Sequence, residues 1–218
     1  AGCTGFVDLS RLAFTETQLN HNNYIFCLSG DLNSRIVNNN DYALSCVFGD
    51  LVNLSIFKAS TSAEIIKDFF HYEVSLKHSN YIKRELNGFL QMDGMDVMTF
   101  VCDSVVPVLI EYLNKLKTKS PLSEYSLVLH QANKFIVEFI NKKIKKNFPE
   151  ITTHAFCMED IGNTGSSTIP FALQTYHSKK ELKRKSIVCG YGVGMSVNIA
   201  ILNMSEKFLV DKNSFIEI

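Results

Sequence analysis

Residues 126–202 alternate short, continuously apolar runs with longer segments whose apolar side chains recur every three to four positions. Runs of the first kind predict buried strands, and segments of the second kind predict helices. Strands that alternate with helices indicate a layered α/β architecture in which helices pack on a sheet. The predicted strands are 126–129, 151–156, 187–189 and 197–202, and the predicted helices are 132–144 and 164–176.

The first half of the chain has a less regular pattern. Apolar residues recur at helical spacing from Phe6 to Leu19, which predicts a helix that begins at or just after Cys3. A long helix over 94–116 is expected to be interrupted near Pro107, because proline lacks the backbone donor that the helix needs. The remaining runs predict a buried strand over 24–28 that ends in a turn at 29–31, a hairpin formed by 43–48 and 51–57, and a strand over 64–74.

Composition excludes several classes of protein. The 218 residues are 46% hydrophobic, which is enough for a packed core and excludes disorder. Lys plus Arg and Asp plus Glu both number 22, so the overall basic field of a nucleic-acid-binding protein is absent. The basic runs 142–146 and 179–185 are expected on solvated helix ends, with a basic docking surface as the alternative.

The uncharged segment 186–205 is long enough to span a bilayer. Its glycines and asparagines separate two short β-rich runs, so a buried strand–turn–strand is the better interpretation. We therefore expect no membrane partner and no nucleic-acid partner.

The six cysteines indicate a reducing compartment. They are scattered without a Cys-x-x-Cys pair, which removes the usual zinc spacing, and most lie in apolar runs. Free thiols of this kind are typical of cytoplasmic proteins, and no metal site is expected. The chain starts abruptly at Ala1 and reads like the middle of a larger domain or a processed chain.

Cys3 is the first candidate for chemistry. It lies in a turn of small residues directly before the predicted helix that begins near Gly5. A thiol at the positive end of a helix dipole has a lowered pKa and a larger thiolate fraction. The alternative is that Cys3 is one more buried thiol without chemistry.

Three further positions could act with Cys3. His130 ends the apolar run 127–129, and ligands gather at the carboxyl ends of strands in open sheets, although a structural histidine is an equal alternative. Asn163 lies in a turn before a predicted helix, where an N-cap is the alternative. The glycine-rich turn 190–196 suits a backbone that presents N–H groups to an oxyanion. Together these residues form a plausible activated nucleophile with donors for a thioester carbonyl.

Four motifs resemble the β-ketoacyl-acyl-carrier-protein synthase III family of the thiolase superfamily. They occur in the order of that family, with similar intervals, over essentially the whole chain. The motifs are Ala-Gly-Cys-Thr-Gly-Phe from Ala1, His-Gln-Ala-Asn from His130, Gly-Asn-Thr-Gly-Ser-Ser-Thr-Ile-Pro-Phe-Ala-Leu from Gly162 and Gly-Tyr-Gly-Val-Gly-Met-Ser from Gly190.

This resemblance implies a thiolase-like α/β fold of five layers, α-β-α-β-α, built from two similar halves and usually dimeric. Residues 1–60 would be the remainder of the N-terminal half and residues 61–218 the C-terminal half, with most of the first half-domain absent from this chain. A homodimer is expected, with the preceding N-terminal segment as a separate chain in one version of the assembly.

The resemblance also implies an activity and a set of site residues. The family transfers an acyl group from acyl-CoA onto a cysteine, here Cys3, and condenses it decarboxylatively with malonyl-acyl-carrier protein to give a β-ketoacyl thioester. No cofactor is implied beyond the coenzyme A thioester, which is a substrate. By match, Cys3, His130 and Asn163 are catalytic, and the backbone N–H groups of Cys3 and Val193 form the oxyanion hole. The matched substrate-binding residues are Gln131, Asn133, Tyr191, Gly192 and Gly194.

Two departures from the family pattern affect the substrates. Val193 replaces a glycine and would narrow the acyl pocket, and Lys134-Phe135 stands where the family often has an arginine that holds the carrier protein. The alternative functions are acyl transfer to an amine or alcohol without condensation, a non-catalytic partner chain of a thiolase-like assembly, and a papain-like hydrolase, which also uses Cys, His and Asn.

Overall fold

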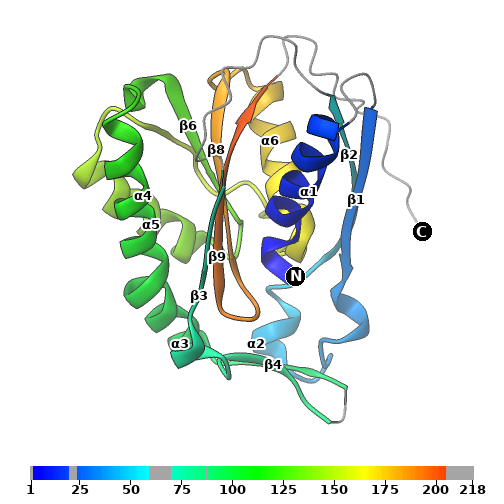
Figure 1. Cartoon of the computed structure of the whole chain (residues 1–218). Coiled ribbons are helices and arrows are strands. Elements are labelled where there is room, and N and C mark those ends of the chain that lie inside the picture. The colour runs from blue at the N-terminus through cyan, green and yellow to red at the C-terminus, as the bar shows by residue number, and fades with distance from the viewer. Residues whose placement is uncertain (1, 20–23, 59–69, 87, 205–218) are drawn as a thin grey trace.

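The computed structural model describes residues 2–19, 24–58, 70–86 and 88–204, which form four successive layers (Figure 1). The helices α4 (Val106–Lys117) and α5 (Lys134–Asn147) cover one face of a five-stranded sheet. The helices α1 (Gly5–Leu19) and α6 (Thr168–Ser178) cover its other face. Beyond α1 lies a ribbon of two antiparallel strands, β1 (Tyr24–Leu32) and β2 (Asp50–Lys58). The described residues thus supply four of the five layers, α-β-α-β, that the motifs imply.

The five-stranded sheet is mixed, with the order β3-β9-β8-β6-β7. β6 is parallel to both β7 and β8, whereas β9 is antiparallel to β8 and β3. The strand–turn–strand predicted for the uncharged segment 186–205 is confirmed as the β8–β9 hairpin, and none of the helices described is long and apolar enough to cross a membrane. The strands are β3 (Phe70–Val74), β6 (Tyr125–Leu129), β7 (Thr152–Thr153), β8 (Lys185–Gly192) and β9 (Ser196–Asn203).

The amino-acid sequences of the central strands are continuously apolar because both faces of the sheet are buried. Ile187, Cys189 and Tyr191 of β8 pack with the residues of α4 and α5. Val188 points to the opposite face, where it packs in the cluster that contains Phe6 of α1. This two-sided burial fixes the register of β8, since a slip of one residue would exchange the two faces.

The long helix predicted for 94–116 is interrupted, as expected from Pro107. It consists of α3 (Gly94–Phe100), a π-helical turn (Val101–Val105) and α4, and Pro107 lies in the first turn of α4. Because proline has no N–H to donate and its ring crowds the preceding turn, the wider π turn accommodates it. The Asp93 carboxylate caps α3 by accepting from the backbone N–H groups of Met95 and Asp96.

The strand predicted over 24–28 is longer than expected, and the turn at 29–31 is wrong. β1 continues through Leu32 and pairs with β2 along its whole length. Only one face of the ribbon is covered, so Cys27 is buried while Phe26 and Leu28 are exposed. Gly30 lies opposite Val52, and a Cβ at Gly30 would lie 2.9 Å from the Val52 Cγ2 atom. The close approach of the partner strand, which the local sequence does not reveal, explains this glycine.

Other predicted strands, in both halves of the chain, are corrected as well. Residues 43–48 do not form a hairpin strand: Tyr42–Ser45 is the short helix α2, whose first N–H groups are capped by the Asp41 carboxylate. β2 pairs with β1 instead. The strand predicted for 151–156 is reduced to β7, and the strand predicted for 64–74 is β3 from Phe70, with 64–69 outside the described residues. A small antiparallel ribbon, β4 (Ile82–Arg84) and β5 (Leu90–Met92), has no counterpart among the predicted strands.

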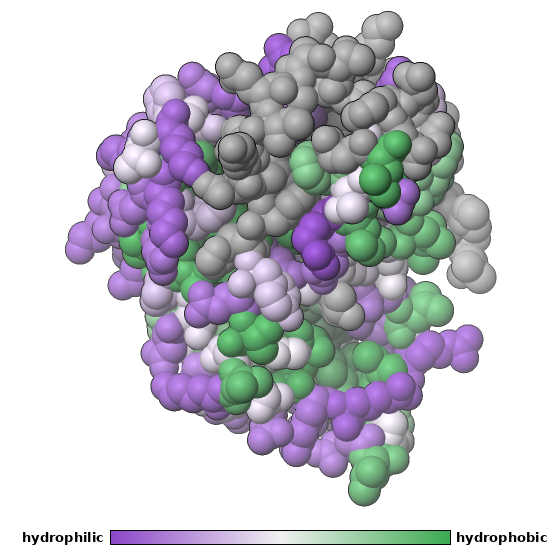
Figure 2. All heavy atoms as spheres, in the orientation of Figure 1, coloured by the Kyte–Doolittle hydropathy of each residue, from purple (hydrophilic) through white to green (hydrophobic). Residues whose placement is uncertain are grey.

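The outer face of the β1–β2 ribbon is apolar and exposed. Its side chains lie on the side of the molecule where β1 runs in Figure 1, and hydrophobic atoms are visible there in Figure 2. Contiguous apolar patches of this kind are typical of surfaces that meet another polypeptide. The most exposed of these residues are Tyr24, Phe26, Leu28, Leu32, Val52, Leu54 and Ile56.

Candidate active site

Cys3 lies in a short 3-10 turn, Gly2–Thr4, that leads directly into α1, so the helix predicted to begin at or just after Cys3 is confirmed. The side chain is buried beneath the end of β8. A Cβ atom at Gly192 would lie 2.9 Å from the Cys3 sulfur, and one at Gly190 would lie 3.0 Å from the Cys3 carbonyl oxygen. Gly192 also has a φ of +142°, which side chains rarely adopt. These two glycines therefore let β8 pass directly over the cysteine.

The sulfur of Cys3 is surrounded by backbone donors but is not a thiolate at neutral pH. Burial raises the pKa of Cys3 to about 11, and Asp31 adds a smaller increase. Hydrogen bonds from the backbone N–H groups of Val193 and of Cys3 itself act in the opposite direction. The expectation of a lowered pKa is therefore wrong, because the cost of burying a charged sulfur exceeds the stabilisation by these backbone N–H groups.

His130 follows β6 and is held from both sides. Its backbone N–H donates to the Cys189 carbonyl at 2.8 Å, and its carbonyl accepts the Tyr191 hydroxyl at 2.9 Å. The Tyr191 ring meets the imidazole edge-on, with centroids 5.3 Å apart. The imidazole Nδ1 lies 2.6 Å from the Thr168 hydroxyl oxygen. Burial lowers the pKa of His130 to about 3, so the ring is neutral at neutral pH.

Asn163 is fixed at the other side of the site by bonds on three of its groups. Its amide oxygen accepts the Gly165 N–H at 3.0 Å, which sets the plane of the side chain. Its backbone N–H donates to Val47 at 2.7 Å. Its carbonyl accepts the Gly49 N–H at 3.0 Å and the Asn33 amide at 3.1 Å. The residue is 5% exposed, so the loop that carries it is part of the core.

The three segments meet through shared neighbours. Gly192 touches the Cys3 sulfur, and the adjacent Tyr191 holds His130. Thr168 contacts His130 through its side chain and Gly165 through its hydroxyl, and Gly165 in turn bonds Asn163. The structure therefore gathers the cysteine, histidine and asparagine segments around the end of β8.

Two of the predicted substrate-binding residues, Gln131 and Asn133, form hydrogen bonds within the protein. Gln131 is buried, donates to the Leu129 carbonyl at 2.8 Å and accepts the Cys157 N–H at 3.1 Å. Asn133 caps α5 by accepting the Ile136 N–H at 2.9 Å. These bonds use both groups of the Gln131 amide and the oxygen of the Asn133 amide, and a role of either residue in substrate binding stays a prediction.

The turn between β8 and β9 borders a hollow of about 570 Å³. Gly194 has a φ of +87° with open space around the position of a Cβ, and the Val193 side chain packs on Gly2. The same hollow is lined by Thr4 and Arg11 of the Cys3 segment. Within the described ranges no group of three or more His, Cys, Asp or Glu residues is arranged to hold a metal ion.

Sequence reasoning missed two residues of β1 and its flank that hold the site. The Asp31 carboxylate accepts the Ser166 N–H at 2.6 Å and the Ser166 hydroxyl at 2.7 Å. The Asn33 amide donates to Gly49 at 2.7 Å as well as to Asn163. Their partners are distant in sequence, and Asp31 falls in the stretch expected to be a turn. An acidic residue inside an apolar strand is the one signal that could have indicated this role.

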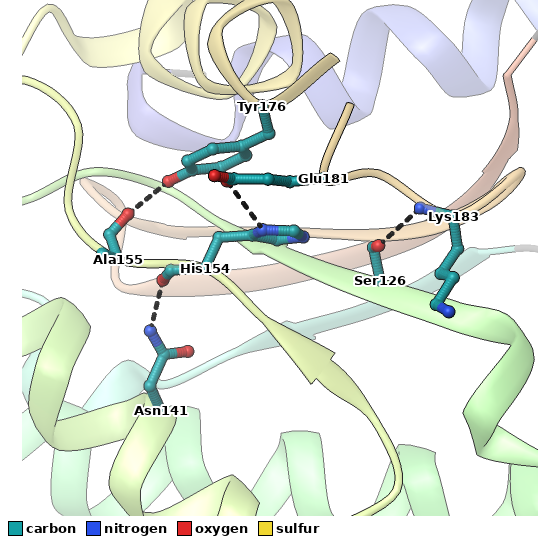
Figure 3. Close-up of polar contacts among 7 residues, drawn as sticks. All are labelled: Ser126, Asn141, His154, Ala155, Tyr176, Glu181 and Lys183. Carbon is teal, nitrogen blue, oxygen red and sulfur yellow. Dashed lines mark hydrogen bonds and ion pairs between the residues drawn. The ribbon is translucent and has the colours of Figure 1, made fainter. Parts of the chain in front are cut away.

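A second buried polar cluster supports the loop that leads to Asn163 (Figure 3). The His154 ring stacks on Tyr176 of α6 with centroids 4.4 Å apart, and the Tyr176 hydroxyl donates to Ala155 at 2.5 Å. The Asn141 amide of α5 donates to the His154 carbonyl at 2.6 Å, and Glu181 lies 3.9 Å from the imidazole Nδ1. Burial, with a contribution from Lys145, lowers the pKa of His154 to about 4. The cluster thus ties the loop to helices on both faces of the sheet.

Comparison with known proteins finds similarity to enzymes named β-ketoacyl-[acyl-carrier-protein] synthase III. Residues 125–204 match the family described as 3-oxoacyl-[acyl-carrier-protein (ACP)] synthase III C terminal. The chain is 27% identical to β-ketoacyl-[acyl-carrier-protein] synthase III of Clostridium botulinum, over 93% of this chain and 66% of the relative. It is 26% identical to the enzyme of the same name from Vesicomyosocius okutanii, over 88% of this chain and 61% of the relative. The chain therefore spans about two thirds of the length of these relatives.

Solved structures show the same fold. A crystal structure of a 3-oxoacyl-(acyl-carrier-protein) synthase III superposes with a TM-score of 0.80 at 24% identity, and covers 94% of this chain and 67% of that chain. The synthase III of Pseudomonas aeruginosa gives a TM-score of 0.77 at 19% identity, over 93% of this chain and 65% of that chain. These similarities confirm the thiolase-like fold class predicted from the motifs.

Proposed function

We propose that this chain, which belongs to the β-ketoacyl-[acyl-carrier-protein] synthase III family, carries the catalytic groups of an acyltransferase that makes a carbon–carbon bond. Its substrates would be an acyl-CoA and malonyl-acyl-carrier protein, and its product a β-ketoacyl thioester. The observation that carries the proposal is the position of the Cys3 sulfur: a Cβ atom at Gly192 would lie 2.9 Å from it, so the backbone of the glycine turn before Val193 lies beside the thiol. Donors in this position stabilise the oxyanion that forms when a thiolate attacks a thioester carbonyl.

The first half-reaction transfers the acyl group to Cys3. The thiol loses its proton, and the sulfur attacks the carbonyl carbon of acyl-CoA. The negative oxygen of the tetrahedral intermediate is held by the N–H groups of Cys3 and Val193. The bond to the coenzyme A sulfur then breaks, and coenzyme A leaves as the thiol with the proton. Because burial raises the pKa of Cys3 to about 11, deprotonation has to be coupled to substrate binding rather than occur in the free protein.

The second half-reaction uses His130 and Asn163. The bond between the malonyl α-carbon and its carboxylate breaks and carbon dioxide leaves, while the electron pair forms an enolate. Hydrogen bonds from the His130 imidazole and the Asn163 amide stabilise the enolate oxygen. Its carbon attacks the acyl carbonyl on Cys3, and the Cys3 sulfur leaves and takes up one proton. A neutral imidazole in a buried site suits a donor role, because its hydrogen bonds are strengthened where water is excluded.

The assembly and location belong to the same proposal. Residues 1–60 would be the remainder of an N-terminal half and residues 61–218 the C-terminal half. The chain would act as a homodimer, in one version with a preceding segment as a separate chain. The exposed apolar face of the β1–β2 ribbon supports contact with another polypeptide. The six free cysteines support a cytoplasmic location.

A labelled acyl-CoA tests the proposal. Mass spectrometry after incubation should find the acyl group on Cys3 and on none of the other five thiols, and Cys3→Ser should carry none. Malonyl-acyl-carrier protein should then release carbon dioxide and give a β-ketoacyl product. Acyl transfer to an amine or alcohol without loss of carbon dioxide would favour the non-condensing alternative, and no acyl-enzyme at all would contradict the proposal.

A further inference from the structure

The carboxylate of Asp31 binds the turn before α6 through a single oxygen. Its Oδ2 atom accepts the Ser166 N–H at 2.6 Å and the Ser166 hydroxyl at 2.7 Å. Asp31 belongs to β1, whereas Ser166 lies in the 3-10 turn Gly165–Ser167 and is 8% exposed. Hydrogen bonds to an ionised carboxylate are stronger than those between neutral groups, so this contact fixes the turn against the β1–β2 ribbon.

The adjacent Gly165 permits this close approach. A Cβ atom at Gly165 would collide with the Asp31 carboxylate, and the φ of Gly165, +58°, lies in the left-handed region that favours glycine. Both the carboxylate and the backbone conformation therefore require glycine at this position. Asp31 thus lies directly against the residue whose N–H reaches Asn163.

The Asn163 side chain depends on Gly165 for its orientation. The bonds to Val47, Gly49 and Asn33 hold only its main chain. Among the described residues, the Gly165 N–H is the one hydrogen-bond partner of this side chain, at 3.0 Å from the amide oxygen. Because this bond occupies the oxygen, it also sets where the amide N–H2 group points. In the proposed function that group donates to the enolate oxygen.

We propose that Asp31 is a positioning residue for the second half-reaction: by holding the turn Gly165–Ser167 it sets the direction in which the Asn163 amide donates. The inference rests on the proposed function for its catalytic consequence. Acylation of Cys3 does not use the Asn163 amide, so loss of the Asp31 bonds should slow decarboxylation and spare acylation. The charge of Asp31 has a separate effect, since it adds to the raised pKa of Cys3.

Two substitutions separate the bonds of Asp31 from its charge. Asp31→Asn is neutral but keeps an oxygen that can accept both donors of Ser166. Asp31→Ala removes the bonds together with the charge. The matched controls are Asp50→Asn and Asp50→Ala, because the Asp50 carboxylate accepts the N–H and the hydroxyl of Ser34 in the same manner at an exposed position of the same ribbon.

Hydrogen exchange of the Gly165 N–H tests the geometry without any substrate. Its rate is taken relative to the amides of β8, so that a general loss of stability cancels. Asp31→Ala should raise this relative rate by roughly tenfold or more, whereas Asp31→Asn and both Asp50 variants should stay within about threefold of wild type. Equal relative rates in Asp31→Ala and Asp50→Ala would overturn the inference, whether or not the protein proves to be a condensing enzyme.

Kinetics of the two half-reactions test the catalytic consequence. Asp31→Ala should slow release of carbon dioxide from malonyl-acyl-carrier protein by roughly 10- to 100-fold, because a misdirected donor loses most of its effect on the enolate. Acylation of Cys3 should not fall by more than about threefold, since removal of the nearby charge favours the thiolate. Asp31→Asn should restore most of the decarboxylation rate.

Three results would overturn the inference: equal losses in both half-reactions of Asp31→Ala, an unchanged decarboxylation rate in that variant, or a loss of the same size in Asp50→Ala. Should Asp31→Ala fail to fold, Ser166→Ala takes its place, because it keeps the carboxylate and removes one of the two bonds. It should show faster exchange of the Gly165 N–H and slower decarboxylation, each to a smaller extent. No change in either measurement would overturn the inference.

Discussion

The carboxylate of Asp31 accepts both the backbone N–H and the hydroxyl of Ser166, at 2.6 and 2.7 Å, although 135 residues separate the two in sequence. Through these bonds the β1–β2 ribbon holds the segment that runs from Asn163 to Thr168, the first residue of α6. The same loop is tied to the ribbon again by the Ser167 hydroxyl, which donates to the Ser29 carbonyl at 3.0 Å. The site is therefore built between two layers of the fold rather than within one.

Removal of the Asp31 carboxylate should destabilise the fold. Asp31→Ala deletes two charge-assisted bonds and leaves the Ser166 donors without their acceptor, so the free energy of unfolding should fall by about 1–3 kcal/mol. Urea denaturation measures the difference. The control is Asp103→Ala, which removes an exposed ion pair with Lys77 and should lower the free energy of unfolding much less. Equal losses in the two variants would contradict the role given to Asp31.

A methyl group over the cysteine should block acylation. Gly192→Ala places a Cβ atom 2.9 Å from the Cys3 sulfur, so acyl-enzyme formation should fall at least 100-fold. Gly194→Ala is the matched control, since Gly194 also has a positive φ but has no atom within 4 Å of the new methyl group. Both variants bear the strain of the backbone conformation, and only the first bears the clash. Similar acylation rates in both would show that strain alone matters.

The thiols should differ in their reaction with iodoacetamide. Because burial raises the pKa of Cys3 to about 11, its thiolate is scarce at pH 7, and alkylation should be slow and increase as the pH approaches 11. Cys46 and Cys102 are exposed and should react faster at pH 7. Acyl-CoA should show the opposite selectivity, since the bound substrate brings its own carbonyl to Cys3. Peptide mapping after short labelling measures both, and fast alkylation of Cys3 at pH 7 would contradict the raised pKa.

Acid should destabilise the protein through its buried histidines. Burial lowers the pKa of His154 to about 4 and that of His130 to about 3, both below the 6.5 of a free histidine. Below pH 6.5 the unfolded chain binds protons that the folded chain does not, so stability is full above pH 6.5 and falls as the pH drops toward 4 and 3. Urea denaturation between pH 7 and 4 measures the loss. His154→Phe keeps a ring that can stack on Tyr176 but does not titrate, and its stability should fall less steeply over this range. Parallel curves for wild type and variant would exclude His154 as a contributor.

The sequence predicted two kinds of element well. The first kind pairs with a segment that is close in the chain, and the second kind is buried on both faces. The β8–β9 hairpin joins strands across a tight glycine turn, and α1 shows its apolar spacing directly. The interruption before α4 follows from the ring of Pro107. β1 was misjudged because its length is set by pairing with β2, which begins 18 residues after the end of β1 at Leu32. Helix α2 was missed because a capping carboxylate at its N-terminus stabilises it, and a search for apolar runs does not detect capping residues.

The sequence by itself determined which residues are the candidates for chemistry: a cysteine before a helix, a histidine after a strand and an asparagine between glycines resemble the family in their chemical types and order. The tertiary structure alone decided their electrostatic states. Burial gives Cys3 a raised pKa where the helix end suggested a lowered one, because desolvation depends on all the surrounding layers rather than on neighbouring residues. The supports of the site, Asp31, Asn33 and Thr168, likewise follow from packing between segments that are far apart in the chain.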